Sequence, residues 1–199
     1  MIAIIDYGMG NLRSVQKAFA FLGAEARITD DPSAIAEASH VVLPGVGAFR
    51  DAIARLREAG LDRSVLETAE SGKPLLGICL GMQLMYEYSE ENGRYEGLGL
   101  VPGGITRLRA PGLKVPHMGW NTIRTRACPL FDAERDLCVY FVHSYCAGEV
   151  RDGVTAAVCE YGAPFTAAAC RGNVMATQFH PEKSGAVGLD MLRRFAAIV

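Results

Sequence analysis

The sequence predicts an α/β fold in which a mixed, mainly parallel sheet is covered by helices on both faces and extended by antiparallel strands. Between residues 1 and 90, short runs rich in Ile, Val and Leu alternate with segments of helical period, which is typical of a parallel sheet with covering helices. Beyond residue 95 the apolar runs become short and closely spaced. We expect these later runs to pair as antiparallel additions rather than as further crossovers.

The first half of the chain supplies the parallel part. Asn11 is a candidate cap for a first helix with Leu12, Val15 and Phe19 on one stripe, and Gly23 is expected to end it. Strands are expected at residues 2–5, 24–28, 40–43 and 74–78, and further helices at residues 49–60, at 62–69 and from residue 80 onward.

The second half supplies the antiparallel part. Strands are expected at residues 104–108, 138–143, 154–161, 165–171 and 174–180, and a last amphipathic helix at residues 187–198. Residues 110–126 are rich in Pro, Gly, Asn and Arg, which predicts a long irregular connection. No repeat or hinge divides the chain, so residues 1–199 are expected to form one domain.

Composition excludes several classes of function. Twenty basic residues against 22 acidic ones leave a net charge of −2, so nucleic acid is not expected as a main partner. The longest uncharged stretch, residues 74–86, is shorter than the roughly 20 residues that span a bilayer. The first residues lack the layout of a signal peptide, so a cytoplasmic protein with six reduced cysteines is expected. Neither the cysteines nor the four histidines show the spacing of a zinc site, and no metal is expected.

A cysteine lies where an exposed nucleophile would be made. The segment Gly77-Ile78-Cys79-Leu80-Gly81 follows an apolar strand and precedes a helix, as in the nucleophile elbow of hydrolases, with sulfur in place of oxygen. A helix N-terminus favours the thiolate, which is the reactive form. A buried structural cysteine on an ordinary turn is the alternative.

Two further segments complete a candidate acyl-transfer site. His180 ends an apolar strand, and in an extended segment Glu182 would lie on the same face and orient its ring. Pro44-Gly45-Val46-Gly47 follows an earlier parallel strand and so meets the same sheet edge as Cys79. The amides of Val46, Gly47 and Leu80 could form an oxyanion hole. Each segment alone has a simpler explanation as a strand end or a turn.

In this order, P-G-V-G, G-I-C-L-G-M-Q and H-P-E resemble the motifs of the class I, or triad, glutamine amidotransferases, whose fold is flavodoxin-like. Four further segments, D-Y-G-M-G-N-L, P-H-M-G-W-N, Y-F-V-H-S-Y and Q-F-H-P-E-K-S, are similar to those of the glutaminase subunits of imidazole glycerol phosphate synthase, from histidine biosynthesis. The resemblance covers the whole chain.

The resemblance implies hydrolysis of glutamine to glutamate and ammonia through a cysteinyl thioester, with no cofactor. It implies that Cys79 is the nucleophile, that His180 is the general base and acid, and that Glu182 orients His180. The glutamine-binding positions that it implies are Gly47, Gln83, Glu91, His143, Ser144 and Tyr145.

It also implies a heterodimer with a (β/α)₈ synthase subunit that uses the ammonia to make imidazole glycerol phosphate and aminoimidazole carboxamide ribotide. A chain of 199 residues cannot also hold such a barrel, which needs about 250 residues. The interface positions that the resemblance implies are Asn11, Met118, Trp120, Tyr140 and Lys183.

Three rival functions remain open. A glutaminase serving pyridoxal phosphate synthesis would share the triad but should lack P-H-M-G-W-N and Y-F-V-H-S-Y. A cysteine peptidase could use a similar elbow. A binding subunit that has lost activity could keep the fold, although the intact Cys79, His180 and Glu182 argue against it.

Overall fold

The computed structural model describes residues 1–199 and is organised around five parallel strands. Their order across the sheet is β2 (Ala26–Thr29), β1 (Ile2–Ile5), β3 (His40–Gly45), β4 (Leu75–Cys79) and β13 (Val174–Thr177). Carboxyl ends of parallel strands meet at one edge, where the register sets Gly45 of β3 opposite Cys79 of β4.

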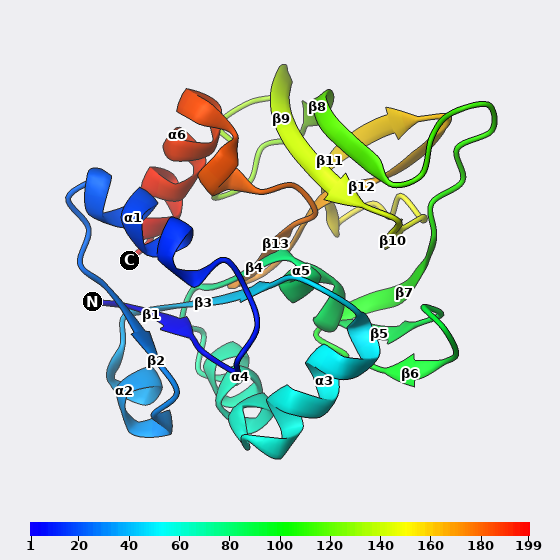
Figure 1. The fold of residues 1–199 in the computed structure, drawn as a ribbon. Helices are drawn as coiled ribbons and strands as arrows, with labels where there is room; N and C mark the ends of the chain where they lie inside the picture. Colours follow the sequence, from blue (N-terminus) through cyan, green and yellow to red (C-terminus); the bar gives the residue numbers. More distant parts are fainter.

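Helices cover both faces of this parallel core. Helices α1 (Leu12–Phe21) and α6 (Gly185–Ala196) lie on one face, whereas α2 (Pro32–Glu37), α3 (Phe49–Glu58) and α4 (Leu61–Glu70) lie on the other (Figure 1). Because side chains of a strand alternate between faces, Ile2 and Ile4 pack under the first pair of helices, while Ala3 and Ile5 pack under the second group.

The antiparallel part extends the sheet beyond β13. Strands β12 (Ala163–Arg171), β10 (Tyr145–Ala147), β7 (Val101–Arg107), β5 (Tyr86–Ser89) and β6 (Tyr95–Glu96) continue it, and only β5 and β7 pair in parallel. A branch formed by β11 (Thr155–Tyr161), β8 (His117–Thr125) and β9 (Asp136–His143) leaves β12. The long ribbon of β8 and β9 stands away from the parallel core in Figure 1.

The expected fold class is confirmed, but several elements differ from the expectations. Residues 110–126 are not one irregular connection, because β8 occupies 117–125. Strands β5, β6 and β10 and helix α2 were not expected from the sequence. The last parallel strand stops at Thr177 rather than at His180, and the helix that follows Cys79, α5 (Leu80–Leu84), is only five residues long.

Three general features of the chain bear on its function. No helix combines the length and apolar character needed to cross a membrane. All six cysteines are free thiols. No three His, Cys, Asp or Glu side chains are grouped so that they could hold a metal ion.

Candidate functional site

Cys79 lies on a sharp turn between β4 and α5. Its backbone has φ 55° and ψ −109°, a conformation that a residue with a side chain rarely adopts and that points to a functional constraint. The turn is possible because glycine stands two residues to either side: a Cβ at Gly77 would lie 2.9 Å from the carbonyl oxygen of Gly81, and one at Gly81 would collide with the carbonyl oxygen of Leu43. The expected elbow is therefore present.

His180 and Glu182 form a buried pair beside this turn. The Nδ1 atom of His180 donates a hydrogen bond of 2.8 Å to Oε1 of Glu182, and both side chains are almost completely buried. The contact was expected but its stated basis was wrong, because Glu182 lies in a 3₁₀ helix, η1 (Pro181–Lys183), and not in an extended segment. The carboxylate fixes the ring tautomer and favours the imidazolium, as in other triads.

The electrostatics of His180 suit a proton carrier. Burial alone would lower its pKa, but the neighbouring Cys79 sulfur and the carboxylate of Glu182 together raise the pKa of His180 to about 9. Its Nε2 atom is buried and makes no hydrogen bond of good geometry within the protein. A free ring nitrogen near a cysteine is the arrangement that proton transfer to or from a bound molecule requires.

One cavity of about 330 Å³ opens beside Cys79 and His180. This is within the usual range for a small-molecule site. The structure brings together here all the residues expected to bind glutamine or to form the oxyanion hole. The lining residues are Val46, Gly47, Cys79, Leu80, Gln83, Glu91, Val142, His143, Ser144, Tyr145, His180 and Lys183.

The polar residues of the cavity are held by hydrogen bonds. Nε2 of Gln83 donates to the carbonyl oxygen of Tyr145 (2.8 Å) and to Oε1 of Gln178 (3.0 Å). Oε2 of Glu91 accepts from the amide of Phe49 at 2.7 Å, so this carboxylate is tied to the start of α3. These contacts fix the side chains before any ligand arrives, which lowers the entropic cost of binding.

Sequence reasoning missed two neighbours of Cys79. Gln178 is fully buried, and its Nε2 atom donates to the sulfur of Cys79 at 3.9 Å. The hydroxyl of Tyr7 donates to the carbonyl oxygen of Pro44 at 2.9 Å and so supports the loop after β3. Both residues lie in segments that were recognised as motifs, but a motif does not say which of its members face the reacting atoms.

The loop after β3 offers unused hydrogen-bond donors. The backbone amides of Val46 and Gly47 make no hydrogen bond within the protein, although both residues line the cavity. Gly47 has φ +99°, and a Cβ there would lie 2.8 Å from the terminal methyl carbon of Met9. Free amides beside a nucleophile are the components of an oxyanion hole.

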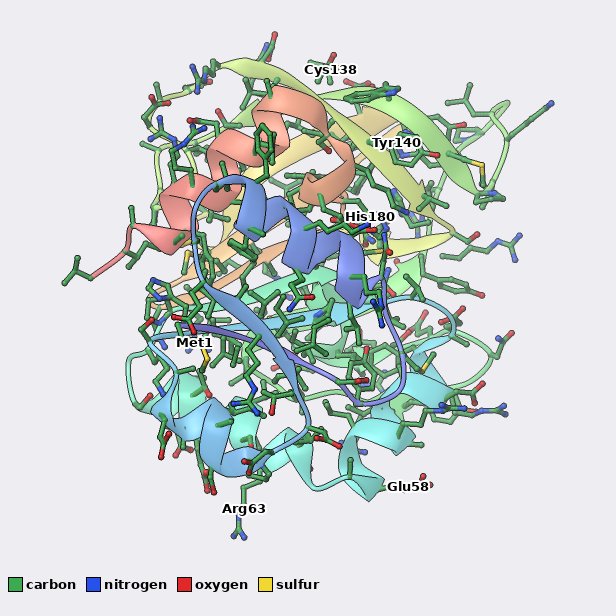
Figure 2. All side chains as sticks on the ribbon, turned by 60° about the vertical axis from the view of Figure 1, so that its left-hand side comes forward. Met1, Glu58, Arg63, Cys138, Tyr140 and His180 are labelled. Atoms are coloured by element: carbon green, nitrogen blue, oxygen red, sulfur yellow. The ribbon has the colours of Figure 1, made fainter.

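Of the expected interface residues, only Lys183 lines the cavity. Met118 and Trp120 are 63% and 57% exposed, and the Trp120 ring meets the Tyr140 ring edge-on at 6.0 Å. Lys183 lines the cavity itself, whereas Asn11 stands at the N-cap position of α1, where its side chain makes no capping bond to a backbone amide but accepts a hydrogen bond from the hydroxyl of Ser14. In Figure 2, Tyr140 and His180 lie on the side of the molecule away from Met1, which stands at the start of β1.

Comparison with known families gives one match across the chain. The family model of the class-I glutamine amidotransferases matches residues 3–199. Among solved structures, a glutamine amidotransferase superimposes over the full length of both chains with a TM-score of 0.78 at 19% identity. A chain of PurLQS from Thermotoga maritima superimposes with a TM-score of 0.76 at 19% identity, covering 98% of this chain and 96% of that one. At these identities the structures support the fold alone.

Relatives of much higher identity carry a more specific name. A protein of Geobacter metallireducens is 52% identical, over 98% of this chain and 97% of its own length. One of Moorella thermoacetica is 52% identical over 100% and 95%, and one of Oceanobacillus iheyensis is 47% identical over 100% of both. All three are named imidazole glycerol phosphate synthase subunit HisH.

Proposed function

This chain belongs to the class-I glutamine amidotransferase family, and we propose that it is the glutaminase subunit of an imidazole glycerol phosphate synthase in histidine biosynthesis. The main support for the proposal is that relatives of that name are 52% identical to this chain and align with 98–100% of its length. The name of these relatives favours this function over the glutaminase of pyridoxal phosphate synthesis and over a peptidase.

Nε2 of His180 takes the proton of the Cys79 thiol, and the sulfur bonds to the side-chain amide carbon of glutamine while the carbonyl π electrons move onto the oxygen. The amides of Val46, Gly47 and Leu80 stabilise the oxyanion that develops. His180, held by Glu182, then gives its proton to the departing nitrogen, so that ammonia leaves and a glutamyl thioester remains. Water attacks the thioester carbon while His180 accepts one of its protons; the C–S bond then breaks, glutamate is released, and His180 returns the proton to the Cys79 sulfur. The chain's own residues suffice for each of these steps.

Glutamine recognition falls to the rest of the cavity. Both hydrogen bonds of the Gln83 side chain are made by its Nε2 atom, and its amide oxygen can accept one from the substrate. The Glu91 carboxylate offers the charge that an α-ammonium group requires, and Gly47, His143, Ser144 and Tyr145 supply the remaining walls.

The synthase partner is a separate (β/α)₈ subunit in a cytoplasmic heterodimer, and it receives the ammonia. Exposed Met118 and Trp120, together with Tyr140, Lys183 and Asn11, form the surface for it. Two exposed large apolar side chains on one face of a strand fit a docking surface, since aromatic residues and Met are enriched in interfaces.

Ammonia release from glutamine, measured with and without the barrel subunit of a related synthase, tests the function. We expect hydrolysis by the complex and little cleavage of peptides. Absence of glutamine hydrolysis in a complex whose formation has been demonstrated would contradict the proposal.

A further inference from the structure

Two buried histidines lie side by side at the cavity: His143 lines it, whereas His117 stands behind His143 and has no role in the function described above. His117 of β8 stands directly opposite His143 of β9, and both side chains are buried. The His117 ring is stacked between the rings of Phe141 (4.7 Å) and Tyr161 (4.0 Å). Packing on both sides leaves this imidazole little freedom to turn, so its hydrogen bonds have a fixed direction.

The hydrogen-bond partners of this pair assign its protons. Nδ1 of His143 lies 3.0 Å from the carbonyl oxygen of Tyr145, which only accepts, so this nitrogen carries the proton. Burial lowers the pKa of His143 to about 3 and that of His117 to about 4, so both rings are neutral near pH 7. Nε2 of His143 is then an acceptor, and Nδ1 of His117, 3.2 Å away, must donate to it.

The chain of hydrogen bonds begins at Asn121. Its Nδ2 atom donates to Nε2 of His117 (3.3 Å) and to the carbonyl oxygen of Glu160 (3.2 Å). This is consistent with the assignment above, because Nε2 is the acceptor atom of a ring protonated at Nδ1. In the series Asn121, His117, His143 and Tyr145, each residue therefore donates its hydrogen bond to the next one, and the series ends at the cavity.

The end of this chain is a segment that needs support. Residues 143–145 leave the ladder with β8 at His143 and join the ladder with β7 at Tyr145, so regular pairing is interrupted between them. The carbonyl oxygen of Tyr145 is held from two sides, by His143 and by Gln83. His143, Ser144 and Tyr145 all line the cavity.

We infer that His117 is a positioning residue for glutamine binding, which holds His143 in its Nδ1–H tautomer and thereby fixes the substrate-binding segment 143–145. It touches neither substrate nor the reacting atoms, and the inference rests on the proposed function of the cavity. The pattern of β8 agrees with it: polar His117 and Asn121 face inward, while apolar Met118 and Trp120 face outward.

Three substitutions at His117 separate positioning from packing. An Asn side chain places an N–H donor near the position of Nδ1, a Gln side chain places it near that of Nε2, and Phe keeps the ring stack without any donor. We expect His117→Phe and His117→Gln to raise the KM for glutamine about tenfold with a smaller change in kcat, and His117→Asn to remain within about threefold of wild type. If His117→Phe does not fold, as judged by thermal denaturation, the Asn and Gln pair decides the matter.

His40→Phe is the matched control. His40 is also buried, packs edge-on against Phe195 at 5.3 Å and hydrogen-bonds the carbonyl oxygen of Ile198, but it has no link to the cavity. Its replacement should leave KM and kcat within about twofold of wild type. Equal KM values for wild type, His117→Phe and His117→Gln would overturn the inference, as would a KM increase of the same size in His40→Phe.

Nitrogen-15 NMR of the histidine rings provides a readout that does not depend on activity. The wild-type chain should show Nδ1–H and unprotonated Nε2 at both His117 and His143. An Nε2–H tautomer at His143 would overturn the inference even if the glutaminase assignment stood. Conversely, a wild-type complex without glutaminase activity would refute the proposed function, while the spectra would still decide the tautomers.

Discussion

The backbone amide of His180 donates a hydrogen bond of 3.0 Å to the carbonyl oxygen of Tyr140, so the loop that carries the proposed base is tied directly to β9. A second link runs through Ser184, whose hydroxyl donates to the carbonyl oxygen of His180 (2.6 Å) and accepts from the amide of Tyr140 (3.0 Å). The Tyr140 ring in turn contacts exposed Trp120. A partner that binds Trp120 would therefore be connected to the proposed base, His180, through Tyr140.

Trp120→Ala should weaken binding of the barrel subunit at least tenfold while leaving the fold intact. Loss of a central aromatic anchor typically costs 2 kcal/mol or more in binding free energy, whereas an indole that is 57% exposed contributes little to the core. Titration of the barrel subunit by calorimetry measures the change. Phe21→Ala is the control, because Phe21 is 78% exposed on α1 and outside the expected interface residues; equal affinities for the two variants would exclude Trp120 from the interface.

Cys79→Ala should lower the pKa of His180 below its value of about 9, because the thiol is one of the two groups that raise it. A raised pKa stabilises the fold fully below the ordinary value of 6.5 and loses that contribution as pH rises through about 9. In Cys79→Ala the contribution should be smaller, and its loss should be complete at a lower pH. NMR titration of the His180 ring gives the pKa in both proteins, and an unchanged value would mean that the thiol does not contact the ring.

Glu182→Gln should reduce glutamine turnover less than His180→Ala. An amide can still accept the hydrogen bond from Nδ1, but it cannot stabilise the imidazolium, whereas loss of His180 removes the proton carrier. Steady-state rates of the liganded complex measure both effects. A His180→Ala variant as active as wild type would exclude the triad.

Gly47→Val should reduce the stimulation of glutaminase activity by the barrel subunit more than it weakens subunit binding. We expect the isolated chain to be slow and the liganded complex at least tenfold faster, a gain of only about 1.4 kcal/mol in the activation free energy. One oxyanion-hole donor is worth roughly 3 kcal/mol. A β-branched residue at φ +99° would restrict the turning of this peptide group.

The rate ratio with and without the liganded barrel subunit, compared between wild type and Gly47→Val, measures this effect. Gly23→Val serves as a control for backbone strain, because Gly23 also has positive φ but follows α1, with open space around its Cβ position. Equal stimulation in wild type and Gly47→Val would contradict gating at this loop.

The parallel core and the candidate triad could be predicted from the sequence because both follow local rules. Apolar runs such as residues 2–5 are buried on both faces, and a cysteine between glycines signals a tight turn. Strand β8 could not be predicted in the same way, because its apolar Met118 and Trp120 face solvent while polar His117 and Asn121 face inward. In our proposals the outward apolar side chains bind the partner and the inward His117 positions His143. Strand prediction from alternating polarity assumes instead that the inward side chains are apolar.

Two other features could not be predicted, one because the helix is short and one because the contact joins residues far apart in the sequence. Helix α2 has six residues and only two buried side chains, Ala34 and Ile35, which is too little for a periodic signal. Gln178 is close to Cys79 only because β13 pairs with β4, a contact between residues about a hundred positions apart. Such proximity depends on the sheet order, which no local pattern contains.

The nucleophile is tested most directly by mass spectrometry after treatment of the barrel complex with a glutamine analogue that carries an electrophile at the side-chain carbon. The account predicts a single modification, at Cys79 and at none of the other five cysteines, that is slowed by excess glutamine and absent in Cys79→Ser, which should still fold, bind the barrel subunit and support synthesis from added ammonia. Modification at another cysteine with Cys79 untouched, or glutamine hydrolysis that survives in Cys79→Ser, would contradict it.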